Sequence, residues 1–542
     1  MILITSAAYV EHEFVTEIGL IPPSFLPVQN RRLYELQVEF LRSQNLDEDI
    51  YLSVPESFNI NSYDAVKIKN LGVRIIRVPD DISLGESILY SWNTTASYHD
   101  TFKILHGDTF FINMTLSSHN ELSVHENRGF YKRASIKKLH NPSTNLEESH
   151  TNTEWMKDNN LVLSGYFSFN EPLFFIKSLI ENKFDFVKSI YTYHNAHSMD
   201  LNSSGQWLDL GHINSFFNSR TYLTTQRVFN DLKISKRIVF KKSSTKGKKI
   251  YAEGNWFNTI PPSMRLHVPQ LLSLIKGENN YENSEYCLEY LYLLPLSDLF
   301  VFGSLPLSSW EEILISIKNV INGLHSYTTD DCSLASLNEL YLHKTLERLD
   351  EYSQISSDNL ILVDKKFTYS TEHDPLTIIE LAKKSAAFIN NATKHDVSIV
   401  HGDFCFSNLL FDSRISAIKC IDPRGIDAAG NLTIYGDRRY DLAKLYHSVV
   451  GYYDLIISGR YDIIKSEDQF DIKFFLDEVY QESIEIKFKE IILAGLGYSE
   501  NEIVAITIHL FLSMLPLHSD SPDRQIAFIA NAFRLYKKLI KG

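Results

Sequence analysis

One segment of the chain, residues 398–425, places polar residues at fixed points between short apolar runs, which restricts what it can form. It reads SIVHGDFCFSNLLFDSRISAIKCIDPRG. The apolar run before Asp403 predicts a strand, and the two apolar runs on either side of DSRIS predict a hairpin. Asn408 lies on the loop between strand and hairpin, and Asp422 follows the hairpin. This order predicts that Asp403, Asn408 and Asp422 come together in space.

The three side chains have the chemistry that phosphoryl transfer requires. A carboxylate can orient the attacking hydroxyl, and carboxylate and amide oxygens can bind the Mg²⁺ that bridges nucleotide phosphates. With His401 they form the spacing H-x-D-x-x-x-x-N followed by an Asp after an apolar strand, and residues 436–443 add the element G-D-x-x-x-D-L-A. The combined pattern resembles the aminoglycoside phosphotransferase and choline kinase superfamily.

This resemblance implies a two-lobed, protein-kinase-like α+β domain that uses ATP as phosphoryl donor. It implies that Asp403 is the catalytic base, that Asn408 and Asp422 bind magnesium, and that His401 and Asp441 support the loop. The alternative is a hairpin with chance polar residues at its turns. That alternative does not account for the second element downstream.

The same resemblance leads us to expect an ATP-binding small lobe before this loop. A predicted strand at 237–242 ends in Lys241 and Lys242, and Glu253 opens the helix that follows. A Lys held by a helical Glu can neutralise nucleotide phosphates, as in protein kinases. We take Lys242 in preference to Lys241 and pair it with Glu253 as the nucleotide-binding residues. A solvated surface charge is the alternative for either Lys.

The first half of the chain shows a different pattern, in which strand-like and helix-like segments alternate. This rhythm predicts a parallel sheet with helices on its faces. The predicted strands are residues 2–5, 50–54, 73–78 and 102–105. With 542 residues the chain is too long for one core. We predict domains at 1–225 and 226–542, the second divided into a small lobe (about 226–305) and a helical lobe (about 306–542).

Three segments of the first half resemble the sugar-phosphate nucleotidyltransferases, whose sheet is Rossmann-like and of the glycosyltransferase-A type. They are IPPSFLPVQNRRLY at 21–34, LHGD ending at Asp108, and QWLDLGH around Asp209. By position, the resemblance implies that Asp108 and Asp209 hold Mg²⁺ against a nucleotide, and that residues 83–87 contact its base and ribose. A divalent ion between two carboxylates lowers the repulsion when a phosphate attacks the α-phosphate of a nucleotide.

The first half also departs from that family. It has no Gly-rich loop after the first strand, and Ser24 stands where the family has a Lys. Arg31 and Arg32, or Lys132 and Arg133, could supply the missing positive charge. The alternative is a degenerate domain that keeps the fold and has lost the activity.

Composition restricts the partners of the chain. A formal net charge of −14 argues against a general nucleic-acid binder. The four cysteines show no metal-binding pattern, and the N-terminus lacks the basic start and apolar core of a signal peptide. The most apolar later stretch, residues 505–517, is too short to span a bilayer. We expect a cytoplasmic protein without membrane insertion, and leave open whether it forms a homo-oligomer.

Together the two resemblances predict a bifunctional enzyme. The kinase would phosphorylate a hydroxyl of a sugar, polyol or aminoalcohol with ATP. The first domain would couple that phosphate to CTP, UTP, GTP or dTTP and release pyrophosphate. The product would be an NDP-activated precursor of bacterial capsular polysaccharide, a setting that rests on analogy. Two alternatives stay open: a kinase with a binding or regulatory first domain, and a pseudoenzyme scaffold, which the complete set Asp403, Asn408 and Asp422 disfavours.

Overall fold

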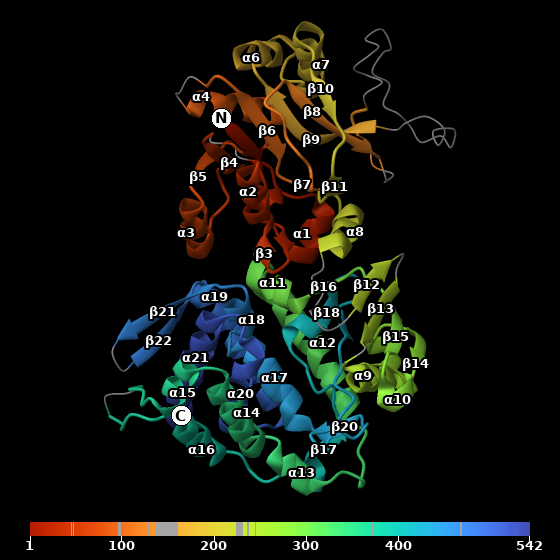
Figure 1. Cartoon of the computed structure of the whole chain (residues 1–542), viewed down its shortest axis with the longest axis vertical. Helices are drawn as coiled ribbons and strands as arrows, with labels where there is room; N and C mark the ends of the chain where they lie inside the picture. Colours follow the sequence, from red (N-terminus) through yellow and green to blue (C-terminus); the bar gives the residue numbers. More distant parts are fainter. Residues whose placement is uncertain are drawn as a thin grey trace. The chain divides into compact units, whose positions relative to one another are not determined.

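The computed structural model describes residues 1–541 except 45, 47, 96–98, 128–130, 132, 136–160, 224–230, 236–237, 244, 370–371 and 467–468. The chain divides into two compact units, Met1–Thr224 and Thr225–Gly542 (Figure 1). Each unit has its own sheets and helices.

The first unit is built on a mixed sheet of seven strands, counted over the described residues, in the order β10-β8-β9-β6-β1-β4-β5. Four of them are mutually parallel: β1 (Ile2–Thr5), β4 (Ile50–Pro55), β5 (Val73–Val78) and β6 (Phe102–His106). The remaining three are β8 (Glu121–Glu126), β9 (Leu161–Phe169) and β10 (Asp200–Asn202), and β9 runs antiparallel to both of its neighbours. The predicted parallel sheet is thus one side of a larger mixed sheet.

Burial follows strand position in this sheet. The central strand β1, of sequence ILIT, is buried along its whole length because both faces are covered. The edge strand β5 is only partly buried, with Arg74 and Arg77 exposed and Ile75 half-buried. Aromatic side chains fill the core beyond β6, where the rings of Phe169 and Phe175 stack at 3.8 Å. The helices of the unit are α1 (His12–Ile18), α2 (Leu33–Ser43), α3 (Ser62–Asn70), α4 (Leu84–Thr94), α6 (Pro172–Glu181), α7 (Phe186–His197) and α8 (Ile213–Leu223).

Two short ladders complete the first unit. β7 (Thr109–Ile112) pairs antiparallel with β11 (Gln206–Asp209), and β2 (Pro27–Val28) pairs with β3 (Arg31–Arg32). The first ladder carries the predicted metal ligands at its end, since Asp209 is the partner of Thr109 and so lies beside Asp108.

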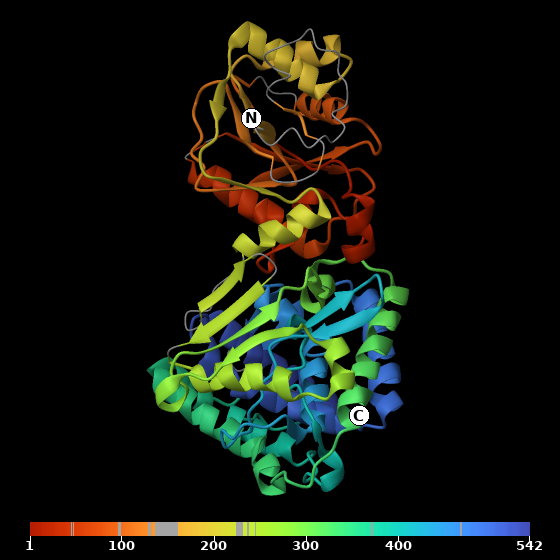
Figure 2. The ribbon, with the colours of Figure 1, turned by 90° about the vertical axis from the view of Figure 1, so that its right-hand side faces the viewer.

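The second unit opens with a four-stranded antiparallel sheet in the order β12-β13-β15-β14 (Figure 2). The strands are β12 (Asp231–Ser235), β13 (Ile238–Ser243), β14 (Leu271–Ile275) and β15 (Ser284–Glu289). Helix α9 (Gly247–Thr259) packs on β14 and β15. A Cβ at Gly254 would lie 2.5 Å from Leu274 and 3.0 Å from Tyr286, so the helix can approach the sheet this closely because that position has no side chain. Because α9 begins at Gly247, Glu253 lies inside the helix and not at its start, where the sequence had placed it.

The rest of the second unit is mostly helical. A small sheet of β16 (Leu294–Pro295), β18 (Leu409–Asp412) and β19 (Ala417–Cys420), and a ladder of β17 (Val397–Ile399) with β20 (Tyr435–Asp437), lie among the helices. The longer helices are α11 (Leu296–Phe302), α12 (Leu307–His325), α14 (Leu342–Ile355), α15 (Ser357–Asp364), α16 (Ile378–Ala386), α17 (Arg438–Val449), α19 (Glu478–Phe488), α20 (Glu500–Ser513) and α21 (Pro522–Lys541). Shorter elements are α10 (Glu278–Tyr281), α13 (Leu334–Glu339), α18 (Tyr453–Ile457), β21 (Tyr461–Ser466) and β22 (Gln469–Phe474).

The most apolar stretch of the sequence forms the centre of this helical part. Helix α20 packs against α14, α16, α17 and α21, and every residue from 503 to 512 is buried. Its hydrophobicity therefore reflects burial on all sides within the protein. Among the described residues, no helix is both long and apolar enough to cross a membrane. The predicted fold class, an α/β sheet domain followed by an α+β domain with a small sheet lobe and a helical lobe, is confirmed.

Candidate active sites

The loop after β17 is held in one conformation by a buried carboxylate of α17. Asp441 accepts hydrogen bonds from the backbone N–H groups of His401, at 2.7 Å, and Gly402, at 2.8 Å. Gly402 has a φ of +77°, and a Cβ there would lie 2.7 Å from the Cβ of Arg424. Only glycine fits this turn without strain. The backbone that presents Asp403 is therefore fixed from both sides.

The imidazole of His401 links this loop to the β18–β19 hairpin. The ring is fully buried; its Nε2 lies 2.9 Å from the carbonyl of Ile421, and its Nδ1 lies 3.3 Å from the backbone N–H of Asp403. These partners assign the proton to Nε2, which donates, and leave Nδ1 as acceptor. Burial lowers the pKa of His401 to about 4, so the ring is neutral near pH 7.

Asp403 and Asn408 are in direct contact. The Asn408 amide nitrogen Nδ2 donates to the backbone oxygen of Asp403 at 2.9 Å and to its Oδ2 at 3.0 Å. The other carboxylate oxygen of Asp403, Oδ1, lies 2.8 Å from the ammonium of Lys444. Burial by itself would raise the pKa of Asp403, but Lys444 and then Arg424 outweigh it and hold that pKa well below its usual range. The carboxylate is ionised near pH 7 and 42% exposed, so it can accept a hydrogen bond from a bound hydroxyl.

The β18–β19 hairpin brings the third predicted residue, Asp422, to a cation from β13 of the four-stranded sheet. Asp422 follows β19 with a φ of +57°, and its Oδ1 accepts a hydrogen bond from the ammonium of Lys241. The same ammonium lies 3.5 Å from Oε2 of Glu253, which also accepts a hydrogen bond from the Tyr286 hydroxyl at 3.0 Å. Glu253 is buried, and this raises its pKa, an effect that the nearby Lys241 opposes. β13, α9 and the hairpin thus meet at one charged cluster.

Lys242 lies outside this cluster. Successive side chains of a strand point to opposite faces, so Lys241 and Lys242 cannot both face α9. In β13 it is Lys241 that does so, while the Lys242 ammonium lies 3.5 Å from Oε2 of Glu285. The structure therefore replaces Lys242 by its neighbour as the Lys paired with Glu253.

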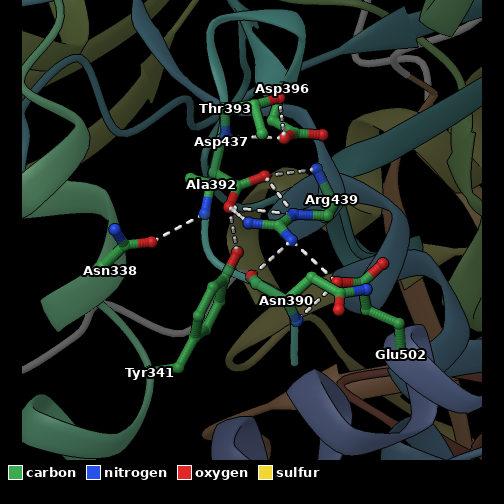
Figure 3. A network of polar contacts seen from close by, with 9 residues as sticks. All are labelled: Asn338, Tyr341, Asn390, Ala392, Thr393, Asp396, Asp437, Arg439 and Glu502. Carbon is green, nitrogen blue, oxygen red and sulfur yellow. Dashed lines mark hydrogen bonds and ion pairs between the residues drawn. The ribbon is translucent and has the colours of Figure 1, made fainter. Parts of the chain in front are cut away.

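A network at the start of α17 fixes the helix that carries Asp441 and Lys444 (Figure 3). Asp437 caps the helix by accepting from the Arg439 backbone N–H at 2.9 Å, and it also accepts from the Tyr341 hydroxyl at 2.8 Å. The Arg439 guanidinium, 3% exposed, donates to Asp437 and, at 2.7 Å, to Glu502 of α20. The spacing of four residues, one helical turn, between the capping Asp437 and Asp441 places Asp441 on the side of α17 that faces the loop.

Two basic residues near Asp403 were not singled out from the sequence. Lys444 follows Asp441 by one helical turn, so helical spacing could have placed both on the same face of α17. Arg424 follows Asp422 by two residues, and its backbone N–H donates to the His401 carbonyl at 2.8 Å. Its proximity to Asp403 depends on that tertiary contact and carries no signal in the local sequence.

In the first unit, Asp108 and Asp209 converge at Gly211. The backbone N–H of Gly211 donates to Oδ1 of Asp209 at 3.1 Å, and a Cβ on Gly211 would lie 2.3 Å from Oδ2 of Asp108. The Asp108 carboxylate therefore rests against this glycine. Burial, and to a smaller extent the charge of Asp209, raise the pKa of Asp108. Two carboxylates crowded in this way favour a cation between them.

One cation already faces this pair. The Arg133 guanidinium forms an ion pair with Asp209 and stacks 4.8 Å from the centre of the Trp207 ring. Of the three described residues that could replace the missing Lys charge, Arg31, Arg32 and Arg133, it is Arg133 that the structure places beside the carboxylates. Lys132 lies outside the described residues.

The other residues of the predicted nucleotide loop make structural contacts. Ser24 is buried; its hydroxyl donates to the Gly107 carbonyl at 3.2 Å, and its backbone N–H donates to Ser6. Arg31 pairs with two glutamates of α2, and the buried Arg32 forms an ion pair with Asp64 at 3.2 Å. Ser83 caps α4 together with Glu86. Ser24 therefore brings no charge to the loop, and Arg31 and Arg32 are both held in ion pairs with carboxylates.

The donor atoms at both places suit Mg²⁺. Asn408 Oδ1 and the Asp422 carboxylate in the second unit, and the Asp108 and Asp209 carboxylates in the first, are the hard oxygen ligands that this ion prefers. Among the described residues, no three or more His, Cys, Asp or Glu side chains form a closed metal site. Mg²⁺ commonly uses one or two protein oxygens and completes its shell with phosphates and water, so two ligands per site are compatible with it.

Comparisons with known proteins find similarity to solved structures for each part. The N-terminal part is similar to a nucleoside-diphosphate-sugar pyrophosphorylase from Vibrio cholerae, at 13% identity and a TM-score of 0.32, over 41% of this chain and 99% of that one. The C-terminal part is similar to the choline kinase LicA from Streptococcus pneumoniae, at 12% identity and a TM-score of 0.32, over 59% and 92% of the two chains. It is also similar to an aminoglycoside 2′-phosphotransferase-IIIa in complex with GDP, at 11% identity and 0.34, over 58% and 91%. No family model and no curated protein sequence matches the chain.

Proposed function

We propose that the chain is a bifunctional transferase, with phosphoryl transfer from ATP in the second unit and nucleotidyl transfer in the first. The observation that carries the first half of this proposal is the convergence of Asp403, Asn408 and Asp422 with the Lys241–Glu253 pair. One loop, one hairpin and one sheet lobe supply these groups, and each is fixed by contacts of its own.

In the proposed kinase, Asp403 accepts a hydrogen bond from the acceptor hydroxyl and orients its oxygen toward the γ-phosphate. The low pKa of Asp403 suits a positioning role, because phosphoryl transfer passes through a loose transition state that requires little proton removal in advance. Lys241, held by Glu253, neutralises the nucleotide phosphates. Asn408 and Asp422 would hold the magnesium, which lowers the repulsion between the phosphate oxygens.

In the proposed nucleotidyltransferase, Asp108 and Asp209 would hold Mg²⁺ beside the α-phosphate of CTP, UTP, GTP or dTTP. A phosphate oxygen of the phosphorylated acceptor forms a bond to that phosphorus, and pyrophosphate leaves. Arg133 is the cation available to the phosphates. The product is an NDP-activated sugar, polyol or aminoalcohol, which we assign to bacterial capsular polysaccharide synthesis in the cytoplasm.

A second candidate function is a kinase whose first unit only binds or regulates. It is favoured by the buried Ser24 in place of a Lys and by the structural ion pairs of Arg31 and Arg32. The retained pair of Asp108 and Asp209 favours nucleotidyl transfer, and we therefore rank that function first.

Two assays on the purified full chain test the proposal. ATP and Mg²⁺ are incubated with sugars, polyols and aminoalcohols, and ADP release is measured; each phosphorylated product is then incubated with each nucleotide, and pyrophosphate is measured. Acceptor-dependent ADP release followed by pyrophosphate release from one nucleotide supports both activities. ADP release without pyrophosphate from any nucleotide selects the second candidate, and no acceptor-dependent ADP release with any compound contradicts the kinase assignment.

A further inference from the structure

Three basic side chains from three different elements gather on the catalytic loop of the second unit. Lys344 comes from α14, Arg424 from the segment after β19, and Lys444 from α17. The Tyr440 ring contacts two of them: the Arg424 guanidinium is 5.6 Å, and the Lys344 ammonium 5.8 Å, from its centre. Arg424 also donates a hydrogen bond to the Tyr440 hydroxyl at 3.4 Å. We call these four residues the basic cluster.

The basic cluster adjoins Asp403. Lys444 contacts the Asp403 carboxylate directly, and Arg424 packs its side chain on Gly402, the residue before it. Lys241, the proposed phosphate-binding Lys, reaches the site separately through Asp422 and Glu253. The site thus has one cation assigned to the nucleotide and a second, larger group of cations around the residue that orients the acceptor.

The carboxylates in this region neutralise only part of the basic cluster. Asp403 is paired with Lys444, and both oxygens of Asp441 accept backbone N–H groups of the loop. In the described part of the chain, neither Lys344 nor Arg424 has a carboxylate partner within ion-pairing distance. Both lie against the Tyr440 ring, and Arg424 also contacts the Tyr440 hydroxyl and the His401 carbonyl. This excess of positive charge stands out in a chain of net charge −14.

The pKa of the Tyr440 hydroxyl is consistent with this local excess of positive charge. Burial would raise its pKa, yet the charges of Lys344, Arg424 and Lys444 lower the pKa of Tyr440 to about 8. Partly buried cations without a counter-ion are costly unless a ligand supplies the negative charge. The place where that ligand charge would sit is next to the hydroxyl that Asp403 orients.

Resting on the proposed kinase function, we propose that Lys344, Arg424 and Tyr440 bind an anionic group of the acceptor. The acceptor is then a hydroxy acid, a sugar acid or a sugar phosphate, in which a carboxylate or phosphate lies near the hydroxyl that becomes phosphorylated. Arg424 offers a planar pair of donors for such an anion, Lys344 offers a point charge, and the Tyr440 hydroxyl a further hydrogen bond. Neutral polyols and cationic aminoalcohols lack the group that this cluster binds.

Matched acceptor pairs test this proposal by ADP release from the full chain with ATP and Mg²⁺. The pairs are D-glycerate and glycerol, D-galacturonate and D-galactose, and glucose 6-phosphate and glucose, with choline as the cationic member. We expect at least one anionic member to have a kcat/KM about 10-fold or more above its neutral counterpart, since a hydrogen bond between charged groups contributes that much. Carboxylate and phosphate pairs distinguish the two kinds of anion.

Lys344→Gln is the diagnostic variant because the side chain is partly exposed and has no structural ion pair. It should lower kcat/KM for the preferred anionic acceptor about 10- to 100-fold, mainly through KM, and leave the KM for ATP unchanged. Lys383→Gln, an exposed Lys of α16, is the matched control and should change neither. Retention of full anionic preference in Lys344→Gln overturns the proposal.

The remaining outcomes distinguish a failure of the anionic-acceptor proposal from a failure of the kinase function. If Asp403→Asn abolishes ADP release but neutral acceptors or choline are preferred, the kinase function stands and the anionic acceptor is wrong. If Asp403→Asn leaves acceptor-dependent ADP release unchanged, the kinase function itself fails. If no member of the panel is turned over, calorimetric titration with D-glycerate and glucose 6-phosphate in the presence of a non-hydrolysable ATP analogue decides. Binding that is lost in Lys344→Gln supports the proposal, and equal binding or none to both proteins overturns it.

Discussion

Lys241 and Lys242 are adjacent in β13 and identical in type, but their side chains contact different partners. Lys241 contacts Asp422 and lies beside Glu253, whereas Lys242 lies beside Glu285 on the opposite face of the sheet. Strand geometry allows only one of them to meet α9, and the structure places Lys241 there. Substituting each Lys in turn therefore tests whether Lys241 binds the nucleotide, because the two variants lose the same kind of side chain from neighbouring positions.

Lys241→Met should raise the KM for ATP and lower kcat by about 10²-fold or more, because it removes a charge that acts on the phosphates in the transition state. Lys242→Met should stay within about twofold of the wild type in both constants, since a solvated charge contributes little. Steady-state ADP release at varied ATP checks both. Equal effects of the two substitutions, or a larger effect of Lys242→Met, would contradict the assignment.

Asp403 offers the most direct test of the catalytic loop. Asp403→Asn keeps the volume and the hydrogen bond from Asn408, but it removes the charge that orients the acceptor hydroxyl. Kinase turnover should fall about 10²–10⁴-fold while ATP binding is retained. Asp364→Asn, at an exposed carboxylate of α15, is the control. Wild-type turnover in Asp403→Asn, measured on protein with an unchanged circular dichroism spectrum, would rule out this role.

At the scale of elements, a buried histidine of α20, His509, makes the stability of the helical part depend on pH. His509 is 2% exposed; its Nδ1 lies 3.0 Å from the Thr345 hydroxyl of α14, and its Nε2 lies 3.4 Å from the Ser385 hydroxyl of α16. Burial lowers the pKa of His509 to about 4 from an ordinary 6.5. The unfolded chain therefore takes up this proton before the folded chain does. Stability that is complete above pH 6.5 is lost as the pH falls from 6.5 toward 4.

His509→Gln keeps polar atoms for Thr345 and Ser385 and removes the titration. Between pH 7 and pH 5, the wild type should lose about 2 kcal/mol more local stability than the variant, the value expected for a pKa difference of this size over 1.5 pH units. Hydrogen exchange of the α20 amides, corrected for the intrinsic effect of pH, measures the difference. A wild type and a variant with the same pH dependence would show that His509 is not the group that titrates.

The elements also show what the sequence could and could not predict. Strands β1, β4, β5 and β6 were predicted because short apolar runs between helical patterns have few alternatives. The other side of the sheet, where β9 runs antiparallel, was not predicted, since β8, β9 and β10 pair across long separations that no local pattern encodes. Within the site, spacing alone indicated Asp403, Asn408 and Asp422 as a set. The choice of Lys241, and the approach of Lys344 and Arg424, depend on which face of each element is buried, and local sequence leaves that open.

At the scale of the whole molecule, the two candidate sites lie in units that have separate sheets and separate cores. Among the described residues, the side-chain contacts of Asp108 and Asp209 given above, with Gly211 and Arg133, lie within the first unit. Those of Asp403 and Asp422 lie within the second. Each site should therefore bind its own nucleotide and its own Mg²⁺.

The variant Asp108→Asn with Asp209→Asn tests this independence. It should eliminate pyrophosphate release, because neutral amides bind a divalent cation far less well than carboxylates do, and Arg133 loses its ion-pair partner. ADP release by the kinase should stay nearly unchanged, since coupling between distinct sites usually amounts to about 1–3 kcal/mol and leaves activity measurable. Both activities are measured on one preparation of the variant, whose thermal unfolding is compared with that of the wild type. Loss of ADP release in a folded variant would mean that the two units form one composite site. If the wild type itself releases no pyrophosphate from any nucleotide with its own phosphorylated product, the first unit is a binding module. The physical reason is then the buried Ser24 at the position of the expected Lys, because no Lys reaches the phosphates from that position.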